Sequence, residues 1–227
     1  MASACLFGDT PVPSAPRNNP EINVAIELPI DINSVKGFLS ADEGEALYRC
    51  ASGMESGLPA VEIGSYCGKS TVYLGLGCRE AGSSLFAVDH HRGSEEHQPG
   101  EFFHDPELVD GRGNFSTLET FRNTIADAGL EDSVIPILAS SAQFAASWTG
   151  PIGMVFIDGG HSLDAALTDY RAWAGHLPTG GILAIHDVYP NSEDGGQAPI
   201  TVFRMARDSG LFAVRESVDS LRVLERL

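Results

Sequence analysis

The sequence predicts an α/β fold built on a doubly wound, mostly parallel sheet of seven strands with helices on both faces. Five short, almost wholly apolar runs alternate with helical stretches, as strands do when a parallel sheet is covered on both faces. Two further apolar runs follow close together near the carboxyl end, which is typical of a hairpin at a sheet edge. The predicted strands are 58–63, 84–89, 133–138, 153–158, 181–186, 211–216 and 221–226.

Helical periodicity occupies stretches between and before these strands. Ser40 and Glu43 have the spacing of a capping box, and the apolar residues that follow lie three and four positions apart. A later stretch has one apolar face and stops at Gly129. The expected helices are 41–56, 116–128, 162–175 and one that begins near Gly68.

The domain organisation follows from composition. A chain of 227 residues is long enough for one domain with a sizeable core, which we place at 35–227. Residues 9–20 hold four prolines and no apolar period, so 1–34 is expected to be a flexible or extended arm. The segment 90–114 is unusually long for a connection and carries four of the seven histidines. We predict a substrate-covering lid there, and a solvated loop is the alternative.

The charge balance restricts the partners. With 31 acidic and 14 basic residues, the formal net charge is −17, which disfavours nucleic acid and anionic membranes. No apolar run is long enough to span a membrane, and the first residues do not resemble a secretory signal. The four cysteines form no C-x-x-C pair and are interpreted as reduced. We expect a cytoplasmic protein.

The segment VEIGSYCGKST (61–71) ends like a phosphate-binding P-loop. That motif needs a glycine five residues before Gly68, but the residue there is Ile63, and the nearest glycine is Gly64. The nicotinamide-binding G-x-G-x-x-G spacing is also absent from this segment. A P-loop-like NTPase therefore stays open as an alternative, and what remains is a strand ending in E-x-G, a tight glycine turn and a helix start.

Polar residues follow all five strands of the predicted parallel sheet. Ligands bind such sheets beyond the carboxyl ends of the strands, so these positions are the candidate site. The strand ends read Glu62-Ile63-Gly64, Asp89-His90-His91, Ala139-Ser140-Ser141, Asp158-Gly159-Gly160-His161 and His186-Asp187.

At these strand ends the sequence resembles the class I S-adenosylmethionine-dependent methyltransferases, a Rossmann-like fold. VEIGSYCGKST is similar to the first motif of catechol O-methyltransferase and its small-molecule relatives. FIDGGHS and GGILAIHD resemble the fourth- and fifth-strand motifs of a bacterial branch that includes metal-assisted sugar O-methyltransferases. The resemblance covers roughly residues 35–226, with the motifs in the right order.

The resemblance implies a binding site for S-adenosylmethionine around the glycine turn. Gly64 and Gly68 allow the backbone to approach a ligand closely, and the helix start near Gly68 presents free N–H groups to the cofactor's carboxylate. Asp89 can accept both ribose hydroxyls. The candidate cofactor-binding residues are Glu62, Gly64, Ser65, Tyr66, Gly68, Ser70, Asp89, Ser141 and Asp158.

The resemblance also implies a metal and a base. Asp158, His186 and Asp187 are the candidate ligands of Mg²⁺, which would orient the acceptor hydroxyl and lower its pKa. His186 stands where relatives have an acidic residue, so magnesium affinity is expected to be lower or a transition metal preferred. Asp158 could instead bind the cofactor's amino group without a metal. His161, three residues after Asp158, is the candidate general base, and helix capping is its alternative role.

These observations predict O-methylation of a small polar acceptor, with a sugar or oligosaccharide hydroxyl as the expected target. A homodimer is compatible with this prediction. The alternatives are the NTPase named above and a partner protein that binds S-adenosylmethionine without catalysis.

Overall fold

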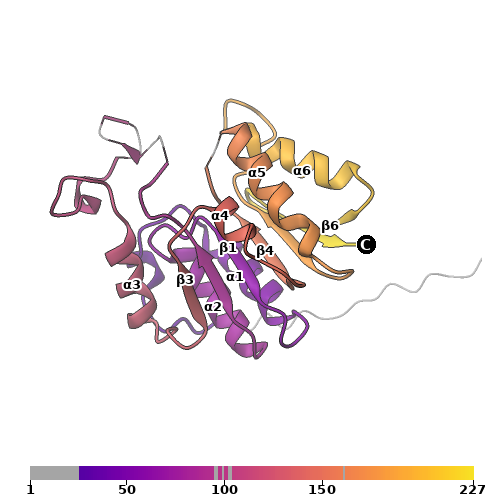
Figure 1. The fold of residues 1–227 in the computed structure, drawn as a ribbon, viewed down its shortest axis with the longest axis horizontal. Coiled ribbons are helices and arrows are strands. Elements are labelled where there is room, and N and C mark those ends of the chain that lie inside the picture. The colour runs from indigo at the N-terminus through magenta and orange to yellow at the C-terminus, as the bar shows by residue number, and fades with distance from the viewer. Residues whose placement is uncertain (1–25, 95–96, 99, 102–103, 161) are drawn as a thin grey trace, which may run out of the picture.

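The computed structural model describes residues 26–94, 97–98, 100–101, 104–160 and 162–227, and Figure 1 shows their arrangement. One sheet of seven strands has the order β3-β2-β1-β4-β5-β7-β6. β1 to β5 run parallel, and β7 is antiparallel to both β5 and β6, which confirms the predicted sheet and its terminal hairpin. The strands are β1 (Ala60–Ile63), β2 (Leu85–Val88), β3 (Val134–Ile137), β4 (Met154–Ile157), β5 (Ile182–Ile185), β6 (Phe212–Val218) and β7 (Leu221–Arg226).

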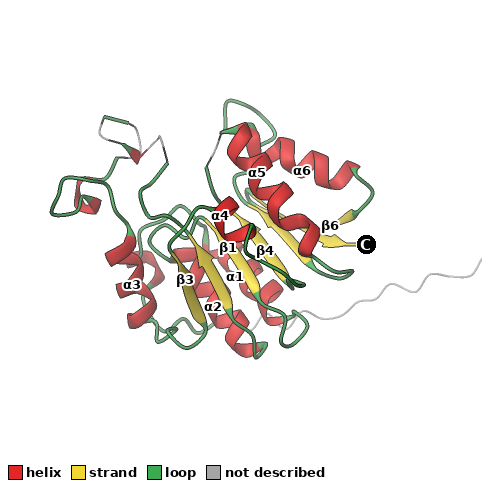
Figure 2. Cartoon of the chain, viewed as in Figure 1, coloured by secondary structure: helices red, strands yellow, loops and turns green. Residues whose placement is uncertain are grey.

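Helices cover both faces of this sheet (Figure 2). One face packs against α1, α2 and α3, and the other packs against α4, α5 and α6. The helices are α1 (Ala41–Ser52), α2 (Lys69–Glu80), α3 (Leu118–Asp127), α4 (Ser141–Ala145), α5 (Leu163–Trp173) and α6 (Ala198–Asp208), with short 3-10 turns η1 (Ile32–Ser34), η3 (Pro106–Leu108) and η4 (Ala174–His176).

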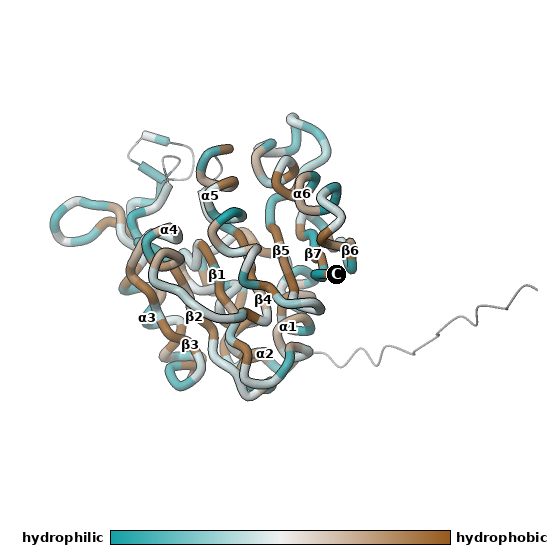
Figure 3. The backbone as a smooth tube through the Cα atoms, turned by 45° about the vertical axis from the view of Figure 1, so that its right-hand side comes forward, coloured by the Kyte–Doolittle hydropathy of each residue, from teal (hydrophilic) through white to brown (hydrophobic). Residues whose placement is uncertain are grey.

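Alternation along each strand decides which side chains meet which helices. In β1, Ala60 belongs to the core under α1 and α2, whereas Val61 and Ile63 belong to the core under α5 and α6. The apolar strands lie inside more polar loops (Figure 3). Ile63 pairs in register with Val88 and Ile157, so the polar residues after these strands meet at one edge of the sheet.

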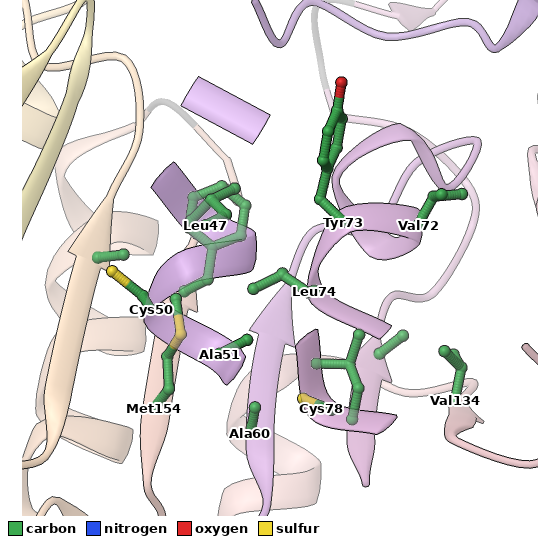
Figure 4. Packing of buried hydrophobic residues seen from close by; sticks show 14 of the residues in the cluster. Leu47, Cys50, Ala51, Ala60, Val72, Tyr73, Leu74, Cys78, Val134 and Met154 are labelled. Carbon is green, nitrogen blue, oxygen red and sulfur yellow. The ribbon is translucent and has the colours of Figure 1, made fainter. Parts of the chain in front are cut away.

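Helix α1 packs closely against α2. Leu47 of α1 and Leu74 of α2 are fully buried in the cluster that also contains Ala60 of β1, and Figure 4 shows these residues. Burying each leucine contributes about 1.5–3 kcal/mol. A Cβ at Gly77 would lie 2.7 Å from the Tyr48 carbonyl oxygen, so the absence of a side chain there permits the close approach.

The described chain begins inside the segment that the sequence assigned to the arm. Ile26 packs against the core, and Ile32 is buried in η1, whose N-cap Asp31 accepts a hydrogen bond from the Asn33 N–H. Residues 1–25, most of the predicted arm, lie outside the described residues. Within 26–34 the backbone is therefore docked on the domain.

Candidate functional site

The glycine turn connects the end of β1 to the start of α2. Gly64 and Gly68 have φ values of 87° and 93°, and Tyr66 between them has φ 46°. The Gly68 N–H donates to the Ser65 carbonyl, which closes the turn. A Cβ at Gly64 would lie 2.1 Å from the Asp158 carbonyl oxygen. Gly64 is thus required both by its left-handed backbone and by the approach of β4.

Asp89, which follows β2, is held by the backbone around it. One carboxylate oxygen accepts the N–H of Tyr66 at 2.9 Å, and the other accepts the N–H of His91 at 2.7 Å. A carboxylate has about four acceptor positions, so Asp89 keeps capacity for a ligand's hydroxyl groups. The side chain predicted to bind ribose is therefore fixed beside the glycine turn.

Glu62 lies beneath the turn, on the α2 side of the sheet. Its two oxygens accept hydrogen bonds of 2.6 Å from the hydroxyls of Ser70 and Thr71, in the first turn of α2. Burial raises the pKa of Glu62 to about 8, although these two hydrogen bonds lower it. In this structure Glu62 and Ser70 bind each other, so their contact with a cofactor stays a prediction.

Two features of the turn fit an anionic ligand group. Gly68 is the N-cap of α2 and provides no side-chain cap, which leaves the first N–H groups of a 12-residue helix uncapped. Ser65 is 1% exposed, and its hydroxyl has no hydrogen-bond partner among the residues that the structure describes. A buried hydroxyl without a partner is costly, and a ligand carboxylate would satisfy it. The turn therefore fits the amino-acid end of S-adenosylmethionine.

A second polar centre lies at the ends of β4 and β5. Asp158, His186 and Asp187 each offer a ligand atom within 4.8 Å of the others. Nδ1 of His186 lies 3.0 Å from Asp158 Oδ1 and 3.6 Å from Asp187 Oδ1, and Nε2 lies 3.1 Å from Glu43 Oε2. Burial alone would lower the pKa of His186, but Asp158, Glu43 and Asp187 together raise it to about 11.

This donor set fits a divalent cation. Two atoms that each lie about 2.1 Å from one ion are about 3.0 Å apart at a right angle, and Nδ1 of His186 and Oδ1 of Asp158 are separated by 3.0 Å. Two carboxylates and one imidazole suit Mn²⁺ or another transition metal as well as Mg²⁺. Bound there, a cation would act as a Lewis acid on an acceptor hydroxyl.

A pocket adjoins this centre. It is lined by Asp158, Gly159, Gly160 and His186, and α6 adds Pro199 among its other lining residues. Asp158 and Asp187 expose 24% and 21% of their side chains, whereas His186 exposes 3%. The two carboxylates are therefore accessible from outside, while the imidazole stays buried.

The segment 90–114 lies over the glycine turn in its described part and extends away from the sheet at the upper left of Figure 1. The rings of Tyr66 and His97 are 5.3 Å apart, and His97 is 5.3 Å from Phe115. Lys36, next to the start of the domain, forms ion pairs of 2.5 Å with Asp105 and 2.7 Å with Glu107. The predicted lid is thus connected to both the turn and the amino-terminal segment.

Three other predicted features stand as follows. The Ser141 hydroxyl accepts a 2.8 Å hydrogen bond from the Trp173 indole, and its contact with the cofactor stays a prediction. His161, the predicted base, lies outside the described residues. Lys69, which a P-loop would direct at phosphates, donates instead to the Gly37 carbonyl at 3.4 Å, so the structure does not favour the NTPase alternative.

Sequence reasoning assigned no role in the site to two residues that the structure places there. Glu43 was noticed only as a helix cap, yet it contacts His186 across 143 residues of sequence. His91 is 2% exposed, donates its N–H to Asp89 and pairs its Nδ1 with the Thr117 hydroxyl at 2.7 Å. The Ser-x-x-Glu pattern was the one signal for Glu43, and it does not reveal a partner so distant in the chain.

The sheet order, the glycine turn after β1 and the acid after β2 define the class I methyltransferase fold. The chain belongs to the methyltransferase-domain family, whose model matches residues 61–188, more than half of its length. The sequence prediction of a methyltransferase is therefore confirmed. Among the residues that the structure describes, no helix is both long and apolar enough to cross a membrane.

Solved structures share the fold at low sequence identity. The cofactor-bound Rv0187 from MTB is 15% identical, with 85% of this chain and 84% of that chain covered and a TM-score of 0.61. The O-methyltransferase TomG from Streptomyces achromogenes, in complex with SAM, is 15% identical, with 83% and 81% covered and a TM-score of 0.56. The SAH-bound methyltransferase PaMTH1 from Podospora anserina is 14% identical, with 84% and 80% covered and a TM-score of 0.57.

Proposed function

We propose that this chain transfers the methyl group of S-adenosylmethionine to a hydroxyl oxygen of a small polar acceptor, with a sugar or oligosaccharide as the preferred class. One observation carries the proposal: the glycine turn with its fixed Asp89 and the cluster of Asp158, His186 and Asp187 lie at the same edge of the sheet. A cofactor site and an acceptor site are thereby adjacent, as a direct transfer requires.

The residues of the turn would hold the methyl donor. Asp89 would accept the ribose hydroxyls, and the uncapped start of α2 with the Ser65 hydroxyl would bind the carboxylate of the amino-acid end. The turn is positioned by backbone hydrogen bonds, so little reorganisation is needed on binding. Each of these roles agrees with the chemistry of the group that carries it.

The residues after β4 and β5 would orient the acceptor. Asp158, His186 and Asp187 would bind a divalent cation, Mg²⁺ or a transition metal, and that cation would supply the Lewis acidity described above. The acceptor oxygen attacks the methyl carbon in line with the departing sulfur, the C–S electron pair returns to sulfur, and the sulfonium becomes a neutral thioether. His161 would take the hydroxyl proton as the new C–O bond forms.

A methyl-transfer assay tests the proposal. The protein is incubated with S-adenosylmethionine and a panel of sugars and phenols, with Mn²⁺, Mg²⁺ or a chelator, and S-adenosylhomocysteine formation is measured. We expect turnover with a sugar hydroxyl and its loss in His161→Ala, whereas His176→Ala, in η4, retains it. S-adenosylhomocysteine binding must persist in both variants. Tight binding without transfer to any acceptor would support the non-catalytic alternative.

A further inference from the structure

Glu43 connects the amino-terminal helix to the proposed metal centre. It lies in the first turn of α1, and its Oε2 is 3.1 Å from Nε2 of His186, at the end of β5. Each of these two side chains exposes only 3% of its surface. A buried carboxylate needs strong partners to remain ionised, and this one has several.

The Glu43 carboxylate is fixed by four contacts. Its Oε2 accepts the Ser40 N–H at 3.0 Å, which completes a capping box, in addition to its contact with His186. Its Oε1 accepts the N–H of Ser220 at 2.9 Å and the Ser220 hydroxyl at 2.7 Å. Ser220 lies in the turn between β6 and β7, so α1, the terminal hairpin and β5 converge on one carboxylate.

The two nitrogens of the His186 ring both face carboxylates. Nε2 faces Glu43, and Nδ1 faces Asp158 and Asp187 at 3.0 and 3.6 Å. A carboxylate can only accept, so each nitrogen carries a proton in this structure. A cation held by Asp158 and Asp187 would replace the proton on Nδ1, while Nε2–H stays with Glu43. Metal-bound histidines commonly donate their other ring N–H to a carboxylate, which fixes the orientation of the ring.

We propose that Glu43 is a positioning residue for the metal centre: it holds His186 by Nε2–H so that Nδ1 completes a cation site with Asp158 and Asp187. The inference rests on the metal site of the proposed function. It adds a residue from outside the matched region 61–188, and it makes the site depend on the docking of α1.

The test measures metal binding without turnover. Free Mn²⁺ is followed by electron paramagnetic resonance in titrations of the wild type, Glu43→Gln, Ser220→Ala and Asp187→Asn. Glu43→Gln keeps the shape of the side chain but replaces one carboxylate oxygen with an NH₂ group, which cannot accept a hydrogen bond. That NH₂ faces either Ser220 or the pair Ser40 and His186. Ser220→Ala is the matched control, since it removes a hydrogen bond from the same carboxylate without touching His186. Binding of S-adenosylhomocysteine, measured by calorimetry, checks each fold.

We expect Glu43→Gln to weaken Mn²⁺ binding about 10- to 100-fold, as loss of such outer partners does. Ser220→Ala should change it less than about threefold. If Asp187→Asn loses affinity but Glu43→Gln binds Mn²⁺ like the wild type, the role of Glu43 is refuted while the metal site stands. If the wild type binds no Mn²⁺, or if Asp187→Asn binds it equally well, the metal site itself fails and the inference fails with it.

A measurement on the wild type covers the case in which Glu43→Gln does not fold. The protein is labelled with ¹⁵N-histidine, and the His186 signals are assigned by their absence in His186→Asn. Addition of Zn²⁺, a diamagnetic probe, should shift Nδ1 strongly while Nε2 keeps its proton. Coordination through Nε2, or no change at His186, would overturn the proposal.

Discussion

Glu62→Gln should remove a pH-dependent weakness from the fold. Glu62 is fully buried, and burial raises its pKa from 4.5 to about 8 against the hydrogen bonds of Ser70 and Thr71. Between pH 4.5 and 8 the folded protein therefore retains a proton that the unfolded chain has lost. The free energy of unfolding must then fall as pH rises through this window, because the folded state binds more protons.

The magnitude follows from the same two values. The pKa of Glu62 is about 8 in the folded state and 4.5 in the unfolded chain, a difference of about 3.5 units. Each unit corresponds to about 1.36 kcal/mol, so the free energy of unfolding changes by about 5 kcal/mol across the full window. A glutamine has the same shape and can bond both hydroxyls, since each hydroxyl can donate or accept. From pH 5 to pH 8, we expect the stability of Glu62→Gln relative to the wild type to rise by roughly 3–4 kcal/mol.

Urea unfolding, followed by tryptophan fluorescence at pH 5, 6, 7 and 8, measures this difference. The control is Glu131→Gln, which removes an exposed carboxylate and should leave the two curves parallel. If Glu62→Gln and the wild type also lose stability in parallel across the window, Glu62 does not titrate as its burial implies, and the reasoning is wrong.

Three further outcomes are expected. Gly64→Ala should lower the free energy of unfolding by at least about 2 kcal/mol and abolish S-adenosylhomocysteine binding, because φ is 87° and the new Cβ would lie 2.1 Å from the Asp158 carbonyl oxygen. An unchanged melting temperature would contradict this. Asp89→Asn should weaken S-adenosylhomocysteine binding roughly 10- to 100-fold in calorimetry, because an amide cannot accept at both ends; equal affinity would remove Asp89 from the site. Lys36→Met should lower the free energy of unfolding by no more than about 1 kcal/mol, since its ion pair with Asp105 is partly exposed. Limited proteolysis should nevertheless cut the segment 90–114 faster in this variant, and an unchanged rate would show that the ion pair does not hold the segment.

The sheet was predictable because its strands are continuous apolar runs. Each of the five parallel strands lies inside its predicted range, and each is shorter because the terminal residues, such as Asp89 and Asp158, belong to the turns that follow. The order of the strands could not be predicted from periodicity, which locates strands along the chain but does not show which of them are neighbours. The helix α6 was not predicted. It begins with Ala198 and Pro199 after a polar stretch, and the side chain of its N-cap residue, Gln197, makes no capping hydrogen bond.

The candidate site was predictable only in part. Parallel strands end at one edge of a sheet, so the polar residues after β1, β2, β4 and β5 could be placed together from sequence. Their hydrogen bonds could not, because the partners of Glu62 and Glu43 depend on how helices dock on the sheet. The contact of Glu43 with His186 joins residues 143 positions apart, and no local pattern encodes such a pair.

The central claim is that the turn after β1 binds S-adenosylmethionine and not a nucleotide triphosphate. Calorimetric titration of the wild type with S-adenosylhomocysteine and with ATP, each with Mg²⁺ and with a chelator, tests it most directly. The account predicts binding of S-adenosylhomocysteine at one site per chain and no heat from ATP. Binding of ATP that requires Lys69, without binding of S-adenosylhomocysteine, would contradict it.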